Sequence, residues 1–311
     1  MKSGFIGIIG RPNVGKSTLM NNILGEKIAI TSAKPQTTLN RITGIYTDLD
    51  YDGGNGLQMV FLDTPGIHKP HNKLGSAINE TAINTLRGVD AVLLLVDGTL
   101  DFGKGDKNIL KLLEDVKERD KEEGGETPMI LAINKMDLMT PDKYLELYNI
   151  YNETGLFEDI YGVSALKGDN VEEIKDRLAG LLKEGPMYYP DDIVTDDPVR
   201  FIASEIIREK LMEYLDDEVP HGVFVEIEEY KEPERPGRAT EISAIIYCEK
   251  KSHKGIIIGK GGAKLKGVGK AARMEIEDLI GGKVFLSLFV KVKEGWRDSE
   301  RTIRNWGYKD E

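Results

Sequence analysis

The chain has 311 residues and a formal net charge of −11, with 40% hydrophobic and 31% charged residues. This length favours two domains, and the composition is typical of a globular protein with hydrophobic cores. No apolar run approaches the ~20 residues that a membrane-spanning helix needs, and the single cysteine, Cys248, excludes an internal disulfide and suits a reducing cytosol. The acidic balance argues against nucleic acid as a partner, except where the charge is locally reversed.

Short aliphatic runs alternate with amphipathic segments from residue 1 to residue 184. Such runs suit parallel strands covered on both faces, and their alternation with helices implies βαβ units. We therefore predict an α/β domain with a mixed, mostly parallel sheet and helices on both faces. Residues 53–56 look like the turn between two early antiparallel strands. The predicted strands are 5–9, 59–62, 91–96 and 129–133, and the predicted helices are 16–24, 74–86, 107–117, 141–152 and 171–182.

Residues 185–198 are rich in proline and acidic residues and have little periodicity, so we predict a linker there. A second, α+β domain is expected over residues 199–311. Its predicted order is a helix, two strands, a glycine- and lysine-rich turn, a helix and a strand. These elements are expected at 199–215, 221–230, 239–249, 263–280 and 283–293.

Gly10-Arg-Pro-Asn-Val-Gly-Lys-Ser17 fits the phosphate-loop pattern and lies between a predicted strand and a predicted helix. Glycines let successive backbone N–H groups turn inward around phosphates, and the helix adds its N-terminal partial charge. Lys16 is expected to reach the β- and γ-phosphates, and Ser17 to ligate Mg²⁺. Alone, the loop predicts only an NTPase. The expected nucleotide contacts are Gly10, Asn13, Val14, Gly15, Lys16, Ser17 and Thr18.

Asp63-Thr-Pro-Gly66 ends a predicted strand about fifty residues further on. A carboxylate at this position holds Mg²⁺ through water in other phosphate-loop proteins, so we predict a nucleotide-contacting and metal role for Asp63. The N–H of Gly66 is expected to contact the γ-phosphate, so that hydrolysis would release the loop behind it. The alternative is a plain turn.

Asn134-Lys-Met-Asp137 follows another predicted strand, and this motif is the one that indicates a guanine nucleotide specifically. An ionised aspartate only accepts hydrogen bonds, so Asp137 matches two adjacent N–H donors of guanine, whereas adenine presents the reverse pattern. A helix-capping role is the alternative. The expected base contacts are Asn134, Lys135 and Asp137, supported by the backbone of Ser164, Ala165 and Leu166.

Together these motifs resemble the translation-factor-like class of GTPases, and Pro35-Gln-Thr-Thr38 resembles the switch I signature of the Era family. The resemblance implies a phosphate-loop GTPase fold that binds GTP or GDP with Mg²⁺. It also implies Thr38 as the second protein ligand of Mg²⁺, beside Ser17 and Asp63, with Thr37 as the alternative. Lys16, Thr38 and Gly66 are then the predicted catalytic residues.

Ile67 stands where many GTPases have a glutamine that orients water, so intrinsic hydrolysis is expected to be slow. Asn13 has two interpretations of equal weight. It is similar to the asparagine that lets some related GTPases bind K⁺ beside the phosphates, where a cation neutralises transition-state charge. It is equally typical of a turn.

The local exception in charge lies between Lys250 and Arg273, where eight Lys or Arg occur without any Asp or Glu. Gly259-Lys-Gly-Gly262 within it fits the G-x-x-G loop of a KH domain, which clamps about four nucleotides. With the expected element order, this predicts a type II KH domain. A solvated lysine face is the alternative. The expected RNA contacts are Lys254, Gly259, Lys260, Gly261, Gly262 and Lys264.

The resemblance to the Era family extends along essentially the whole chain, including Val290-Lys-Val-Lys-Glu-Gly-Trp296. It implies binding to 16S ribosomal RNA near its 3′ end and a role in assembly of the 30S subunit. It further implies loose, peripheral association with the inner face of the cell membrane. Apart from the resemblance, we expect a cytoplasmic protein that is a monomer. The chain departs from the family pattern in its acidic 121–126 loop and its tail after Trp296.

Two other functions compete with an RNA-binding GTPase. A metabolic phosphate-loop kinase is disfavoured by Asn134-Lys-Met-Asp137, and a signalling GTPase whose second domain binds protein is disfavoured by the basic loop. His68 and His71 could suggest a metal or base, but exposed loop histidines are the more common case.

Overall fold

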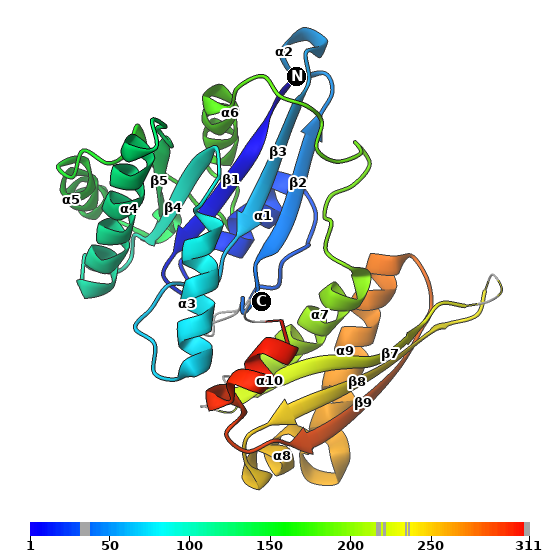
Figure 1. Ribbon diagram of the computed structural model, residues 1–311. Coiled ribbons are helices and arrows are strands. Elements are labelled where there is room, and N and C mark those ends of the chain that lie inside the picture. The colour runs from blue at the N-terminus through cyan, green and yellow to red at the C-terminus, as the bar shows by residue number, and fades with distance from the viewer. Residues whose placement is uncertain (32–37, 216–218, 220–221, 234, 236, 308–311) are drawn as a thin grey trace. The chain divides into compact units, whose positions relative to one another are not determined.

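The computed structural model describes residues 1–31, 38–215, 219, 222–233, 235 and 237–307. These residues divide into two compact units (Figure 1). Unit 1 comprises residues 1–31, 38–196 and 307, and unit 2 the described part of 197–306. Pro35, Gln36 and Thr37 of the expected switch I lie outside the described residues.

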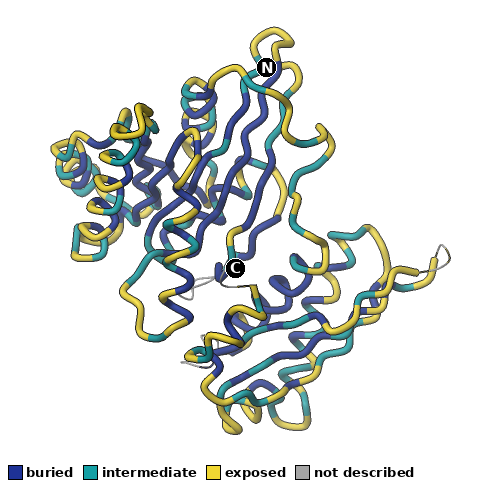
Figure 2. The backbone as a smooth tube through the Cα atoms, viewed as in Figure 1, coloured by how far each residue is buried: buried dark blue, intermediate teal, exposed yellow. Residues whose placement is uncertain are grey.

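Unit 1 is built on a six-stranded sheet with the strand order β2-β3-β1-β4-β5-β6. The β2–β3 pair is antiparallel and the other pairs are parallel, which confirms the predicted mixed, mostly parallel sheet. The central strands are buried along most of their length (Figure 2) because helices cover both faces. The strands are β1 (Lys2–Gly10), β2 (Ile42–Asp48), β3 (Leu57–Asp63), β4 (Ala91–Asp97), β5 (Met129–Asn134) and β6 (Asp159–Gly162).

The helices of unit 1 lie on both faces of this sheet (Figure 1), with α3, α4 and α5 on one face and α1 and α6 on the other. The short α2 (Tyr51–Gly54) closes the β2–β3 hairpin, with Asp52, Gly53 and Gly54 at positive φ. The predicted turn is therefore present. The longer helices are α1 (Lys16–Leu24), α3 (Lys73–Thr85), α4 (Lys104–Glu122), α5 (Pro141–Asn152) and α6 (Val171–Leu181).

Helix α4 is longer at both ends than its apolar periodicity predicts. It begins at Lys104 because Asp106 Oδ2 accepts the N–H of Gly103 at 2.9 Å, which caps the first turn. An acidic side chain at that end also complements the helix dipole. At the other end the polar helix runs on to Glu122, with Arg119 and Lys121 in its last turn, where cations are favourable.

Part of the segment expected to be a linker is fastened to unit 1. The fully buried Gln58 side chain in β3 accepts the N–H groups of Tyr188 and Tyr189 at 2.8 and 3.0 Å. It also donates to the carbonyl of Tyr189 at 2.8 Å. Further on, the N–H of Ile45 donates to the carbonyl of Val194 at 2.8 Å. The segment therefore lies against β3 and along the free edge of β2.

Unit 2 has a three-stranded sheet in the order β7-β8-β9, with β7–β8 antiparallel and β8–β9 parallel. Its helices α7 and α9 bury one face of the sheet in the core of the unit. This is the element order of the predicted type II KH fold. The elements are α7 (Val199–Tyr214), β7 (Phe224–Lys231), β8 (Thr240–Cys248), α8 (Lys251–Ile258), α9 (Ala263–Ile280), β9 (Val284–Val292) and α10 (Glu300–Asn305). No helix among the described residues is both long and apolar enough to cross a membrane.

Candidate functional site

The phosphate loop lies between the end of β1 and the start of α1, where its backbone conformation demands glycine. Gly15 has φ +102°, and a Cβ there would lie 2.2 Å from the side-chain nitrogen of Asn134. Asn13 also adopts a left-handed conformation, at φ +64°. Lys16 is 6% exposed and donates to the carbonyl of Arg11 at 3.2 Å. Burial lowers the pKa of Lys16, and the nearby Asp63 carboxylate opposes that shift.

The three expected metal ligands come together beside Lys16, although they lie far apart in the sequence. Ser17 Oγ donates to Asp63 Oδ2 at 2.6 Å and lies 3.1 Å from Thr38 Oγ1. The register of β2 and β3 brings Thr38 close to Asp63. Asp63, at the end of β3, pairs with Ile42, the first residue of β2, and Ile42 follows Thr38 closely in the sequence. Thr37, the alternative to Thr38, lies outside the described residues.

This oxygen cluster fits a hard divalent cation. Its donors are two hydroxyls and a carboxylate, which Mg²⁺ prefers. Asp63 is fully buried, and its Oδ1 has no hydrogen-bond partner among the described residues. Burial raises the pKa of Asp63 to about 6, against the opposing effects of Lys16 and the Ser17 hydroxyl. A buried carboxylate in this setting is stabilised in its charged form by a bound cation.

Gly66 lies directly against the phosphate loop. A Cβ on Gly66 would approach the backbone nitrogen of Pro12 to 2.5 Å, so only glycine fits there. The next residue, Ile67, donates its backbone N–H to the carbonyl of Gly10 at 3.0 Å, and its apolar side chain packs on the core of unit 1. Ile67 therefore offers the site no polar side chain that could orient a water molecule.

Asn134 links the phosphate loop to the loop after β6. Its side-chain nitrogen donates to the carbonyl of Val14 at 2.7 Å, and its side-chain oxygen accepts the N–H of Ala165 at 2.8 Å. Asn134 is 3% exposed, so both bonds lie in a buried setting. The fold thereby fixes the phosphate and base ends of the site relative to each other.

Asp137 is oriented by its neighbours. Ser164 Oγ donates to Asp137 Oδ1 at 2.8 Å, and Lys167 Nζ lies 3.6 Å from Oδ2. The Ser164 hydrogen bond is the main cause that lowers the pKa of Asp137. The carboxylate is therefore ionised at neutral pH, as acceptance of two guanine N–H groups requires. Leu166, two residues after Ser164, is 80% exposed.

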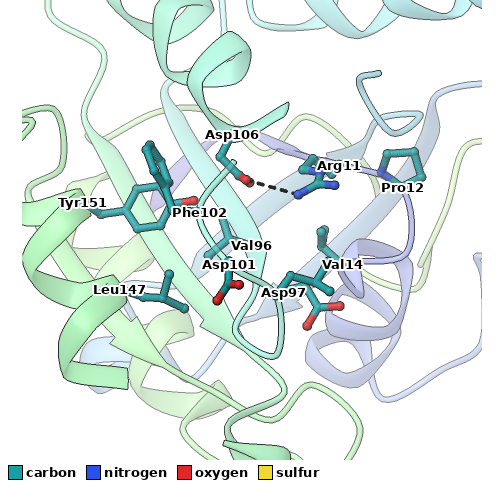
Figure 3. Close-up of a pocket in the computed structure, with 11 residues that line it drawn as sticks. Arg11, Pro12, Val14, Val96, Asp97, Asp101, Phe102, Asp106, Leu147 and Tyr151 are labelled. Carbon is teal, nitrogen blue, oxygen red and sulfur yellow. Dashed lines mark hydrogen bonds and ion pairs between the residues drawn. The ribbon is translucent and has the colours of Figure 1, made fainter. Parts of the chain in front are cut away.

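Two ion pairs that support the site were not predicted from the sequence. Lys135, at φ +66°, places its ammonium 2.5 Å from Asp97 Oδ2 at the end of β4. Arg11 reaches Asp106 in α4 at 3.1 Å, beside a small cavity behind the phosphate loop (Figure 3). The sequence could have indicated Asp97 as a site residue, because it ends an aliphatic strand as Asp63 does. Arg11 and Asp106 carry no such signal.

In unit 2 the G-x-x-G loop joins α8 to α9, in a short turn where three glycines have positive φ. Gly259, Gly261 and Gly262 lie at φ +72°, +59° and +77°. A Cβ on Gly259 would come within 2.6 Å of the Lys264 Cβ, so that position requires glycine. Lys260 is exposed at the tip, and Lys254 is exposed on α8.

The lysines around this loop are free to meet phosphate. Of the eight Lys and Arg between residues 250 and 273, only Arg273 has an ion partner in the part of the chain that the structure describes, Glu277 at 4.0 Å. Elsewhere, ion pairs are common, as in α7, where Lys210 bonds three glutamates. The unpaired lysines thus form a concentrated positive surface.

Comparisons with known proteins agree with this arrangement. Residues 5–135 match the family model described as a 50S ribosome-binding GTPase, and residues 218–297 match the KH domain model. The GTPase Era of Alkaliphilus metalliredigens is 53% identical over 308 residues, and that of Clostridioides difficile is 50% identical over 310 residues. Each alignment covers 99% of both chains.

Two solved structures cover the whole chain and are themselves covered completely. Aquifex aeolicus Era bound to GDP and AlF4⁻ has a TM-score of 0.91 at 37% identity. Era in complex with MgGDPNP and nucleotides 1506–1542 of 16S ribosomal RNA has a TM-score of 0.90 at 37% identity.

Fold and site together define a phosphate-loop GTPase that carries a C-terminal KH domain. The two-domain match and the full-length identity narrow this class, and the chain belongs to the Era family of GTPases. The family, the fold class and the GTPase activity expected from the motifs are therefore confirmed.

Proposed function

We propose that this GTPase holds 16S ribosomal RNA near its 3′ end through the G-x-x-G loop and assists assembly of the 30S subunit, with GTP and GDP states switching its grip. The unpaired lysines around Gly259–Gly262 carry the proposal, because they lie beside glycines that allow close backbone approach to a nucleic acid. Support also comes from the 37%-identical Era that was solved with nucleotides 1506–1542 of that RNA.

In the nucleotide site, each residue has a role that follows from its position. The backbone of the phosphate loop and the Lys16 ammonium would hold the β- and γ-phosphates, while Asp137 reads the base. Ser17, Thr38 and Asp63 would hold Mg²⁺, which when bound neutralises charge on the β- and γ-phosphates. Loss of the γ-phosphate would free Thr38 and Gly66 from it, which is the switching event.

Hydrolysis should be slow because Ile67 stands at the position where many GTPases have a glutamine that orients water. Ile67 packs on the core, so intrinsic turnover is expected at about 10⁻² s⁻¹ or below. Asn13, which adopts a left-handed conformation in the phosphate loop, is proposed to help bind K⁺ there, where a cation would neutralise transition-state charge. Equal turnover in KCl and NaCl would exclude this role.

The RNA site is tested by changing Lys260→Asp and Gly261→Asp together. The variant should lose affinity for the 16S 3′-end fragment, because two carboxylates face phosphates, yet it should hydrolyse GTP at the wild-type rate. Gly261 lies at φ +59°, which aspartate tolerates better than most residues, so folding should survive. If RNA affinity persists in this variant, the RNA site lies elsewhere.

We further propose that the protein works as a cytoplasmic monomer, with the peripheral attachment to the inner face of the cell membrane that its family resemblance implies. Light scattering at micromolar concentration should give the mass of one chain. Fractionation of cells should release a membrane-associated pool with high salt, as expected for electrostatic rather than inserted attachment. A pool that only detergent releases would contradict peripheral attachment.

A further inference from the structure

Unit 1 also contains a cavity of about 240 Å³ that none of the expected nucleotide or metal residues lines. Its lining comes from β1, β2, β3, the end of α3 with the turn that follows it, and the 185–196 segment. Leu62 and Val89 are buried and Phe5 is half-buried, so they give the cavity an apolar floor. An apolar hollow with a few polar groups is typical of sites for small molecules.

Two arginines at the rim of this cavity have no ion partner. Arg41, directly before β2, and Arg87, two residues after α3, both line the cavity and are both exposed. Neither guanidinium bonds or pairs with another residue in the described part of the chain. Elsewhere in unit 1 a guanidinium finds a carboxylate, as Arg177 does with Asp159 at 2.5 Å. The two rim arginines are therefore available to an anion.

The carboxylates near the cavity are already engaged. One acidic residue, Asp196, is among the described residues that line it, and its Oδ2 accepts the hydroxyl of Tyr189 at 2.8 Å. Asp90, three residues after Arg87, accepts the N–H of Phe5 at 2.7 Å instead. The lining thus carries two positive charges and one negative charge. This balance favours an anionic ligand.

The rim is held in place by the fold itself. The N–H of Arg87 donates to the carbonyl of Asn84 at 3.0 Å, which closes the turn after α3. Thr195 Oγ1 donates to the carbonyl of Thr43 at 2.7 Å, which fastens the 185–196 segment to β2. A site that is already formed loses less free energy to ordering when a ligand binds.

The two guanidinium groups suit a phosphate better than a carboxylate. Each guanidinium is a planar fork of N–H donors, and one fork fills both oxygens of a carboxylate. A phosphate monoester has three terminal oxygens, so it can accept hydrogen bonds from two forks at once. A ring attached to that phosphate would pack on the apolar floor, where Phe5 supplies an aromatic face.

We propose that this cavity binds a small phosphate monoester that carries an apolar ring. Its phosphate lies between Arg41 and Arg87, and its ring rests on Phe5, Leu62 and Val89. The site is separate from the nucleotide site and independent of the proposed RNA site in unit 2.

The test uses the full chain saturated with GDP and Mg²⁺, so that the nucleotide site is occupied. Phenyl phosphate is the probe, because it joins a phosphate directly to an apolar ring. An NMR titration should show saturable binding of one molecule per chain at millimolar concentration or below. Arg41→Ala and Arg87→Ala should each weaken this binding at least about tenfold, because hydrogen bonds between charged groups contribute that much or more.

Matched probes and variants control this experiment. Benzoate has a carboxylate on the same ring and phenol has no full charge, so both should bind much more weakly than phenyl phosphate. Arg119→Ala removes a guanidinium that does not line the cavity and changes the net charge equally, so it should bind phenyl phosphate normally. Arg41 and Arg87 are exposed, so GDP affinity, the check on folding, should be unchanged in both variants.

Three outcomes would overturn the proposal. The first is the absence of saturable binding of phenyl phosphate at millimolar concentration. The second is binding that survives both arginine substitutions, because the phosphate would then lie elsewhere. The third is benzoate binding as tight as that of phenyl phosphate, because phosphate would then not be the group that the two arginines recognise.

Discussion

We propose that Asp137 carries most of the discrimination between guanine and adenine. Its carboxylate is held by Ser164, and Lys167 lies near the second oxygen, so it is oriented before a base arrives. Pre-orientation matters because a mismatched base leaves this polar group unpaired.

Replacing Asp137 with asparagine should lower GTP affinity by at least about 100-fold, because one acceptor oxygen becomes a donor that faces a guanine N–H. Displacement of fluorescent GDP measures the loss. Asp142→Asn, in the first turn of α5, is the matched control and should bind GTP normally. A loss below tenfold would show that Asp137 does not pair with the base.

Motif residues were predictable because each follows an aliphatic run that ends at the same edge of the sheet. Lys16, Asp63 and Asn134 are all found there. The sequence could not choose between Thr37 and Thr38, since neighbouring hydroxyls differ only in direction. It also gave no hint that Asn134 bonds both Val14 and Ala165, because that depends on how two distant loops approach.

At the scale of elements, the attachment of the 185–196 segment depends on one buried side chain. Gln58→Leu keeps the approximate volume but removes the bonds to Tyr188 and Tyr189. We expect a loss of about 1–3 kcal/mol in the free energy of unfolding of unit 1. The loss should be measurable by urea denaturation, together with faster hydrogen exchange of residues 187–196.

Thr47→Val is the matched control, because it removes only the hydroxyl to which Gln58 Nε2 donates at 3.0 Å. It should cost less than Gln58→Leu and leave the exchange of the segment unchanged. If the segment exchanges as slowly in Gln58→Leu as in the wild type, then the Gln58 amide does not hold it.

The types of the elements were predictable where hydrophobic periodicity was strong. The ends of helices and the paths of connecting segments were less predictable, because capping residues and side-chain hydrogen bonds determine them. α5 begins at Pro141 and α9 spans 263–280 as expected, because proline, glycine and apolar spacing mark them. The start of α4 was missed because Asp106 caps the helix through Gly103. A glutamine inside a buried strand gives no sign that it anchors a segment 130 residues away.

At the scale of the whole molecule, charge is distributed very unevenly. The net charge is −11, yet eight cations gather between residues 250 and 273. RNA should therefore be attracted mainly to this region and repelled by the acidic parts of the surface.

This distribution makes RNA affinity strongly dependent on salt. If about four phosphates of a single strand are contacted, the slope of log affinity against log salt should be about −3. Filter binding across a KCl series would measure it. Lys260→Ala should reduce the slope by about one unit, and Lys111→Ala on α4 should not. A slope near zero would exclude phosphate contacts as the source of affinity.

The segment that lies along β2 also helps to keep the protein from aggregating. β2 is the last strand of its sheet, and an open strand edge recruits strands from other chains. The carbonyl of Val194 already occupies the N–H of Ile45 on that edge, and Thr195 Oγ1 donates to the carbonyl of Thr43 at 2.7 Å. The segment therefore protects against aggregation as well as joining two units. A GTPase domain produced alone should retain the chain through Asp196, because one cut at residue 184 would expose the edge of β2.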